Sequence, residues 1–293
     1  MKSGFHVFLA SFVALGLSWC GFVFGPAKQL GTAKQAAVLN STDVYPIQRT
    51  GDAALGLQVY RAKGCAACHT EQVRQDGVAC ELVLTDAGKN TARVVKAIQS
   101  LVPYPEAKNS RKQVYSGIEQ YDLTKLPQTV LKNLTKDQAN AVADQITAAG
   151  GKSETHITAS GVEITRGWGL RRSVAADYLY DVPVQLGSLR AGPDLANIGI
   201  RDPDSNWQLV HLYAPVALVK NSAMPPFRYL FEIRTNAGAP SPDALRFPKD
   251  FALPSGCEVV PTTEAKQLAA YLLSLKADAP LYDAPFTKAM AKP

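Results

Sequence analysis

The sequence predicts a mainly α-helical fold with one N-terminal transmembrane helix, interrupted by a small α+β insert. Three features predict it: an apolar N-terminal stretch, helical apolar periodicity on both sides of a long central segment, and mixed strand and helix signals within that segment. The chain has 293 residues, of which 46% are apolar and 19% charged, and this excludes disordered, collagen-like and polytopic membrane proteins. The net charge of +6 is spread without a basic run, so nucleic-acid binding is not indicated.

An almost unbroken apolar stretch runs from Phe5 to Phe24, with His6 as its only acidic or basic side chain. About twenty helical residues span the roughly 30 Å hydrocarbon core, whereas the apolar region of a signal peptide is usually about 7–15 residues. Because no small-residue cleavage site follows, we expect an uncleaved anchor over residues 1–25 rather than a cleaved signal peptide. Lys2 is the only charged side chain before the stretch, which places the N-terminus in the cytoplasm and the body outside it.

Cys65, Cys68 and His69 form the pattern C-x-x-C-H. Two thiols at this spacing can add to the vinyl groups of a haem, and the adjacent histidine then presents its ring to the iron. The alternatives are a dithiol redox pair, which does not need the histidine, and half of a zinc site. Zinc would need two further ligands, and Cys80 with Cys257 makes a poor second half. The pattern therefore favours one covalently attached haem c.

Residues 26–50 show no clear period and are expected to form a linker. A helix is predicted to begin with Asp52 as its N-cap and to end at Gly64, directly before the C-x-x-C-H pattern. A second, C-terminal amphipathic helix opens at Thr262 or Thr263, before Glu264. Its apolar face comprises Ala265, Leu268, Ala269, Leu272 and Leu275. Small haem-c domains pack an N-terminal and a C-terminal helix beside the haem, and this chain supplies both.

A second axial ligand to the iron is expected from Met224, whose loop is stiffened by two following prolines. Met290 lies in a polar tail, and in the absence of a haem Met224 would be an ordinary core methionine. His211, on an apparent helix from Trp207 to Val219, and His156 are the competing ligands. Paired histidine and methionine ligation raises the reduction potential and closes both axial positions, which suits an electron carrier.

Residues 78–158 have patterns of their own and predict an α+β module. The expected elements are a strand over Glu81–Thr85, a turn over Asp86–Asn90, a helical face of Val94, Ile98 and Leu101, a helix with a Thr135–Gln138 capping box, a stop at Gly150-Gly151, and a strand over Ser153–Thr158. The string Val83–Asn90, with Val94–Ile98 and Ala148–Gly151, is similar to the C-terminal domain of the bacterial ribosomal stalk protein. We interpret this insert as an interaction or packing module, or as a lineage-specific decoration.

Five segments outside the insert resemble the mono-haem subunit II of cbb3-type cytochrome c oxidases. They are Cys65–Arg74, Gly167–Asp181, Leu186–Gly199, Trp207–Tyr213 and Ser222–Phe231. With the anchor, the resemblance covers roughly residues 1–75 and 160–287. It implies a cytochrome c-like domain with one haem c ligated by His69 and Met224. It also implies that the Gly192-Pro193 segment, otherwise a plain turn, offers a carbonyl to the other ring nitrogen of His69.

The resemblance implies a single-pass protein of the bacterial inner membrane, with its haem domain on the periplasmic side. Such a subunit is not catalytic alone. It passes electrons from a di-haem cytochrome c subunit, or from another c-type cytochrome, towards the catalytic haem-copper subunit that reduces oxygen. The expected divisions are an anchor at 1–25, a linker at 26–50, a haem domain at 51–77 and 159–287, an insert at 78–158 and a tail at 288–293.

Two other functions remain open from the sequence. One is a haem-based sensor whose sixth iron position opens to a gas. The other is a free-standing, membrane-tethered cytochrome c that serves another redox enzyme. Cys80 and Cys257 are left over in an oxidising compartment, where they either pair or remain as free thiols.

Overall fold

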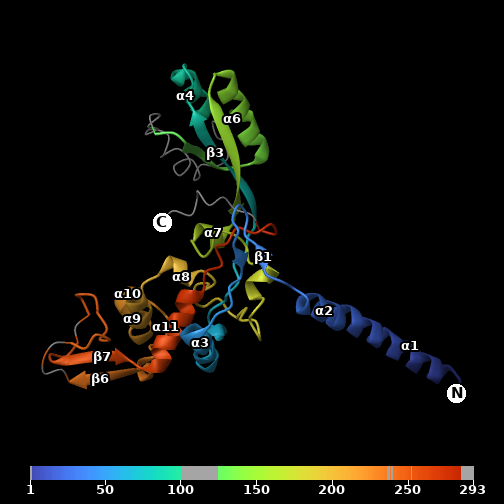
Figure 1. Ribbon diagram of the computed structural model, residues 1–293. Coiled ribbons are helices and arrows are strands. Elements are labelled where there is room, and N and C mark those ends of the chain that lie inside the picture. The colour runs from blue at the N-terminus through green and yellow to red at the C-terminus, as the bar shows by residue number, and fades with distance from the viewer. Residues whose placement is uncertain (1, 100–124, 236–237, 239, 252, 285–293) are drawn as a thin grey trace.

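The computed structural model describes residues 2–99, 125–235, 238, 240–251 and 253–284. It consists of a helical body, a module that extends from one side of the body and a long N-terminal helix that points away from both (Figure 1). The predicted helical face residue Leu101, Met290 and the tail from 288 lie outside the described residues. The prediction of a mainly α fold is supported only in part, because three small sheets accompany the helices in the described residues.

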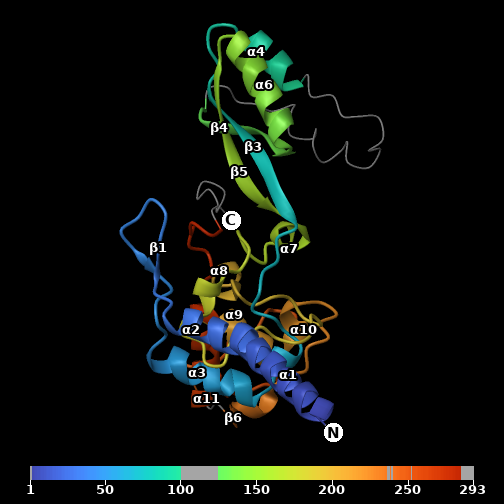
Figure 2. The same ribbon diagram turned by 90° about the vertical axis from the view of Figure 1, so that its right-hand side faces the viewer.

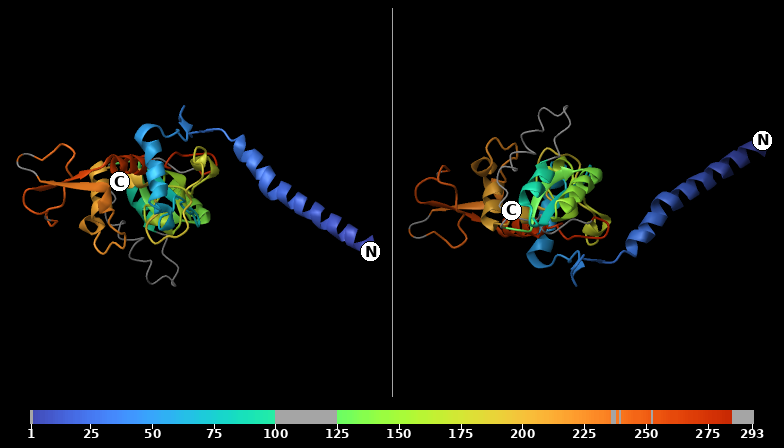
Figure 3. Two further views of the ribbon diagram at one scale, coloured as in Figure 1. Left: turned by 90° about the horizontal axis from the view of Figure 1, so that it is seen from below. Right: turned by 90° about the horizontal axis from the view of Figure 1, so that it is seen from above.

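The N-terminal helix comprises α1 (Lys2–Trp19), a π-helical stretch η1 (Cys20–Phe24) and α2 (Gly25–Gly31). The stretch from Gly4 to Gln29 is long and apolar enough to cross a membrane, and none of it is buried. Figure 3 shows it leaving the rest of the molecule in two opposite views. The π-helical stretch ends two residues before Pro26, which lacks an N–H and cannot continue a regular hydrogen-bond ladder.

The segment expected to be a linker contains secondary structure. The helix continues through Gly31, and a small antiparallel pair follows, β1 (Ala36–Ala37) with β2 (Val44–Tyr45). Tyr45 packs against a small apolar cluster that includes Val174 and Leu281, so the segment is attached to the body by contacts with distant residues, which local sequence patterns do not reveal.

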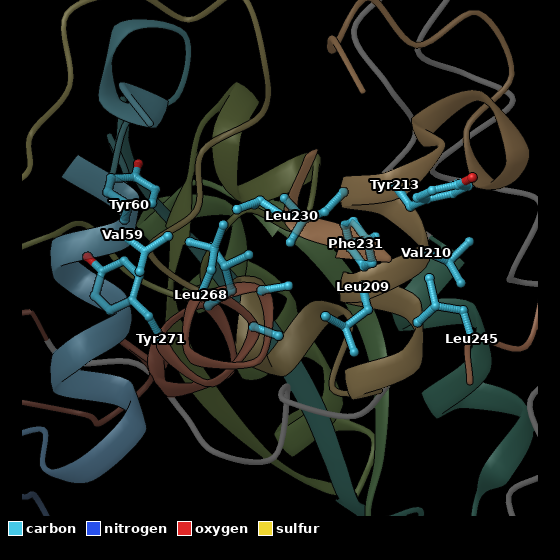
Figure 4. Close-up of a cluster of buried hydrophobic side chains, with 14 of the residues drawn as sticks. Val59, Tyr60, Leu209, Val210, Tyr213, Leu230, Phe231, Leu245, Leu268 and Tyr271 are labelled. Carbon is cyan, nitrogen blue, oxygen red and sulfur yellow. The ribbon is translucent and has the colours of Figure 1, made fainter. Parts of the chain in front are cut away.

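The body is organised around the crossing of α3 (Gly51–Ala62) and α11 (Thr263–Ser274). A Cβ atom at Gly56 would lie 1.9 Å from the carbonyl oxygen of Gln267, so the two backbones meet at a point that only glycine allows. Figure 4 shows Val59 and Tyr60 of α3 beside Leu268 of α11 in the main apolar cluster. The helices expected on either side of the motif therefore pack against each other.

The ends of α3 and α11 follow the sequence with one correction. Gly64, at φ +70°, ends the first helix as expected, and Thr262 caps α11 through its side chain. The N-cap of α3 is Thr50 rather than Asp52, which lies in the first turn, where its charge complements the helix dipole.

The helix expected over Trp207–Val219 is divided into α9 (Ser205–Tyr213) and α10 (Pro215–Leu218). The break falls at Ala214, because the residue before a proline is sterically kept from the α conformation. The remaining short helices and turns of the body are α7 (Val162–Thr165), η4 (Ala175–Tyr178), α8 (Ile198–Arg201) and η5 (Arg228–Leu230).

The body also contains a hairpin formed by β6 (Phe231–Thr235) and β7 (Cys257–Pro261). The sequence pattern does not predict this hairpin. Its buried residues Phe231 and Val259 join the main apolar cluster. Cys257 lies in this hairpin, whereas Cys80 is buried in the module, and both are free thiols. The pairing considered from the sequence is therefore absent.

The module contains β3 (Gly77–Asp86), α4 (Thr91–Gln99), β4 (Gln128–Leu134), α6 (Lys136–Ala148) and β5 (Lys152–Ser160). Its sheet is antiparallel in the order β4-β3-β5, and α4 and α6 lie side by side against it (Figure 2). The Thr135–Gln138 capping box is present, and α6 ends before Gly150. Both expected strands are confirmed and are longer than expected.

The sequence pattern does not predict strand β4. Its buried residues Val130 and Leu131 are adjacent, and this breaks the alternation by which a half-buried strand is recognised. The register between β3 and β4 shifts at Leu82, so a bulge accommodates the irregular pattern.

Candidate functional site

The C-x-x-C-H motif begins where α3 ends. Cys65–Ala67 forms the 3-10 turn η2, and the backbone N–H of His69 donates to the Cys65 carbonyl at 3.0 Å. Cys65 packs partly buried against the main apolar cluster, whereas Cys68 is exposed. The left-handed Gly64 turns the chain so that both thiols and the imidazole follow within one turn.

The ring of His69 is held by the segment 192–193. Its Nδ1 lies 2.8 Å from the Pro193 carbonyl oxygen, and the Gly192 N–H donates to the Cys68 carbonyl at 2.9 Å. A carbonyl only accepts, so Nδ1 carries the proton and Nε2 retains the lone pair that can bind a metal. A Cβ at Gly192 would lie 2.3 Å from Cε1 of His69, so only glycine fits against the ring.

The chain from 186 to 195 surrounds the motif. Ser188 N–H donates to the Ala66 carbonyl at 3.0 Å, and Leu195 N–H donates to the Thr70 carbonyl at 2.7 Å. A Cβ at Gly187 would lie 2.2 Å from the His69 carbonyl oxygen. Two segments more than a hundred residues apart in sequence are thus joined backbone to backbone.

Asp194 ties these segments together and was not assigned a role from the sequence. It is fully buried. Its carboxylate accepts from the Thr70 hydroxyl at 2.6 Å, from Gln72 N–H at 2.7 Å and from Ala196 N–H at 2.9 Å. Burial raises its pKa, while these hydrogen bonds lower it. The signal available in the sequence was its place directly after Gly192-Pro193.

A second buried carboxylate, Glu71, lies beside the motif. The Tyr271 hydroxyl contacts its two oxygens at 2.8 and 2.9 Å. Burial raises the pKa of Glu71 to about 8. Tyr271 belongs to α11, so this contact attaches the motif to the C-terminal helix.

The electrostatics distinguish between the chemistries considered for the motif. Burial raises the pKa of Cys65 to about 11, whereas reactive dithiol cysteines have lowered values. Burial also lowers the pKa of His69, and the nearby Arg201 charge lowers it further, so the imidazole is neutral, as a metal ligand must be. Within the described part of the chain, no three or more His, Cys, Asp or Glu side chains are grouped to hold a metal ion. These features argue against a redox dithiol and a zinc site.

Met224 lies in the loop after α10, partly buried against the main apolar cluster. Its N–H donates to the Ser222 hydroxyl at 3.3 Å. This hydrogen bond lies within the loop, and the apolar packing is what holds Met224 against the body.

Of the two competing histidines, the fold brings only His211 near His69. The ring of His211 stacks on Trp207 with centroids 4.8 Å apart, and its buried Nδ1 has no hydrogen-bond partner among the residues the structure describes. Burial and the proximity of the His69 imidazole lower the pKa of His211 to about 4. His156 instead lies on β5 of the module, with Nε2 3.2 Å from Glu154.

The residues present fit a haem. The motif supplies two free thiols and an oriented imidazole with a free lone pair. Around them, buried polar nitrogens of His211 and Arg201 are left without a partner in the described polypeptide. Buried polar groups without a hydrogen-bond partner cost free energy unless a bound group supplies the partner.

Residues 155–269 match the family model described as cytochrome c oxidase, mono-heme subunit/FixO. No curated protein matches the chain. The matched region contains Pro193, Met224 and His211, and it begins in β5, close to the end of the module. This part of the chain, which does not include the C-x-x-C-H motif, is therefore similar to the mono-haem subunits of cytochrome c oxidase. That family implies a haem cofactor, electron transfer and association with the catalytic oxidase subunits. The N-terminal apolar helix and this family together suggest membrane association.

Proposed function

We propose that this chain is the electron-transfer subunit of a cbb3-type haem-copper oxidase, with one haem c attached to Cys65 and Cys68. The observation that carries the proposal is the placement of His69 beside the two thiols, with Nδ1 bound to Pro193 and Nε2 left free. This arrangement fixes the ring in the tautomer and orientation that an axial ligand requires. The haem domain is a cytochrome c-like fold formed by residues 51–77 and 159–287.

The haem, when bound, supplies one-electron chemistry at iron, and the chain supplies ligation, burial and a docking face. His69 and Met224 would be the two residues that hold the iron. Ligation by both residues would suit electron transfer rather than substrate binding. The packed α3–α11 crossing and the buried Asp194 keep the ligand segment rigid.

The N-terminal helix anchors the protein as a single span in the bacterial inner membrane, with the body on the periplasmic side. The anchor confines the body beside the catalytic haem-copper subunit. Electrons arrive from a di-haem cytochrome c subunit or another c-type cytochrome. The module at 78–158 is an inserted interaction or packing element, and its likeness to the ribosomal stalk domain carries no function here.

The axial assignment is tested with two matched variants, Met224→Ala and His211→Ala, each purified as the full membrane protein. Met224→Ala is expected to open the sixth position, so that the reduced protein binds carbon monoxide while the wild type does not. His211→Ala is expected to leave the sixth position closed, so that this variant, like the wild type, does not bind carbon monoxide. A reversed pattern would assign the second ligand to His211, and carbon monoxide binding by the wild type would favour the sensor.

The oxidase assignment is tested by mild solubilisation of membranes and identification of the proteins that co-purify with the chain. A haem-copper catalytic subunit is expected in the complex. Its absence, with the haem still attached, would favour the free-standing membrane-tethered carrier.

A further inference from the structure

The sheet of the module has two edge strands, β4 and β5, because β3 lies between them (Figure 2). In an edge strand, alternate residues direct their backbone N–H and C=O groups away from the sheet, where a further strand can pair with them. Proteins usually protect such an edge by a bulge, a proline or charged side chains. The two edges of this module are protected to different degrees.

Strand β4 is irregular. Its pairing with β3 shifts register on both sides of Leu82, and Asn133 within it has φ +57°. Such irregularities twist an edge and interrupt its row of free backbone groups. β4 is therefore a poor template for another strand.

Strand β5 is regular and open. Its residues 153–160 pair with residues 84–77 of β3 one by one, without a register shift, and they include no proline. Thr155 is exposed, and the apolar Ile157 is 57% exposed. The described residues that hydrogen-bond to the backbone of β5 belong to β3 or to Asp76, directly before β3. Within the described part of the chain, the outer side of β5 is thus without a partner.

The sequence of β5 is complementary to itself in an antiparallel pairing centred on Thr155. Residues at equal distances from the centre then lie opposite each other, so Glu154 of each copy faces His156 of the other. A carboxylate opposite a basic side chain stabilises a strand pair, whereas like charges opposite each other destabilise it. A pairing centred on Glu154 or on His156 would instead oppose two carboxylates or two imidazoles. The register centred on Thr155 is therefore the favoured one.

The side chains of Glu154 and His156 are already oriented for this pairing. Residues two apart in a strand point to the same face, and His156 Nε2 lies 3.2 Å from the Glu154 carboxylate within one chain. Both side chains keep part of their surface in solvent, 65% for Glu154 and 24% for His156. On β3, Glu81 lies opposite His156, so a second copy would add a further carboxylate to an imidazole that two acidic side chains already flank.

We propose that β5 is a self-association edge, at which two copies of this chain pair their β5 strands antiparallel about a two-fold axis at Thr155. The two sheets then form one continuous sheet across the dimer. A second copy is the partner that this edge fits, because a two-fold axis uses the contact between Glu154 and His156 twice and closes the assembly at two chains. The inference deepens the interaction role proposed for the module, and it does not depend on the haem.

The test measures disulfide cross-linking of the full chain in membranes. Thr155→Cys places a thiol at the axis, opposite the same thiol of the second copy, so mild oxidation should convert the two thiols to one disulfide and give a covalent dimer. The unsubstituted chain sets the background, because it has free cysteines of its own. Thr129→Cys, on the opposite edge strand β4, is the matched control and should add nothing to that background.

Charge changes in the Thr155→Cys background test the register. His156→Glu places a carboxylate opposite Glu154 and should slow cross-linking by about 2- to 30-fold, because the axis repeats each cross-strand pair. Glu154→Lys together with His156→Glu restores opposite charges and should restore the rate, which excludes misfolding of the module as the cause. Thr129→Glu adds the same charge to β4 and should leave the rate unchanged.

Absence of cross-linking above the background in Thr155→Cys would overturn the proposal. Cross-linking that His156→Glu leaves unchanged would overturn it too, since the contact would then not follow this register. Haem per polypeptide should stay at the wild-type value in every variant, because the module and the body have separate apolar cores. A wild type without covalent haem would refute the proposed function alone, whereas haem-containing variants that do not cross-link refute only the self-association.

Discussion

The helical body and the module differ in which of their buried polar atoms lack a hydrogen-bond partner within the described polypeptide. In the described part of the module, the buried polar atoms without partners are the neutral Gln128 Oε1 and Ser153 Oγ, both on outer strands of its sheet. In the body, such atoms include charged or titratable nitrogens of Arg201 and His211 near His69. Because buried charged groups are normally paired, the body, unlike the described part of the module, contains charged or titratable nitrogens that a bound group could satisfy.

The two regions also differ in the range of their contacts. The module is defined by signals such as its capping box, which joins residues three apart. The site is defined by contacts such as that between His69 and Pro193, 124 residues apart. A change in the site should therefore affect the haem, and a change in the module should not.

The largest effect is expected from Gly192→Ala, because the new Cβ would lie 2.3 Å from the His69 ring. The imidazole must then leave its position against Pro193. Loss of such an orienting contact lowers metal affinity by about 10–100-fold, so binding of the haem iron by His69 should weaken, which the absorption spectrum of the holoprotein measures. Gly77→Ala is the control, since its Cβ would come no closer than 3.4 Å to Ser160 Oγ. A wild-type spectrum in both variants would contradict the tight fit at His69.

The next largest effect is expected from truncation of one core residue in each region. These residues are Leu268 in the body and Ile146 in the module, and both are almost fully buried. Truncation of either to alanine should lower the free energy of unfolding by about 2–5 kcal/mol. Because the two side chains belong to separate apolar clusters, each variant should affect its own region. Thermal unfolding followed at the haem absorption and by far-ultraviolet circular dichroism distinguishes them. A haem transition that Ile146→Ala lowers as much as Leu268→Ala does would show that the regions unfold together.

A smaller effect is expected from Thr135→Ala, which removes the side-chain half of the capping box of α6. The free energy of unfolding of the module should fall by about 1 kcal/mol. Thr147→Ala is the control in the same helix, since its exposed hydroxyl bonds only within the helix. Urea unfolding of both variants measures the difference, and equal stability would show that the cap contributes nothing.

The smallest effect on the haem is expected from removal of the module. The start of β3 pairs with the end of β5, with Gly77 opposite Ser160 and Val78 opposite Ala159. A short Gly-Ser turn can therefore replace residues 79–158. The reduced spectrum and the haem content should then match those of the full chain. Loss of haem would mean that the module supports the site.

Local sequence signals predict the structure correctly where a few neighbouring residues determine it. Gly64 ends α3, because glycine tolerates φ +70°, and Thr262 caps α11, because the threonine hydroxyl accepts from the first turn. Long-range features were not predictable in this way. The position of His211 near His69 depends on helix packing, and the hydrogen bonds of Asp194 join segments 122 and 124 residues apart.

Strand β4 and the β6–β7 hairpin were missed for a related reason. Their strands pair across chain separations and register shifts that a single-strand pattern does not encode. The division of the predicted helix at Ala214, in contrast, could have been predicted from Pro215 alone.

The central claim is that a haem is covalently attached at Cys65 and Cys68. It is tested most directly by a pyridine haemochrome spectrum combined with intact mass on the protein purified from membranes. The account predicts a c-type spectrum, pigment that stays with the polypeptide in acidified acetone, and a mass equal to the full chain plus one haem. A colourless protein, or pigment that is extracted by the acid solvent, would contradict the account.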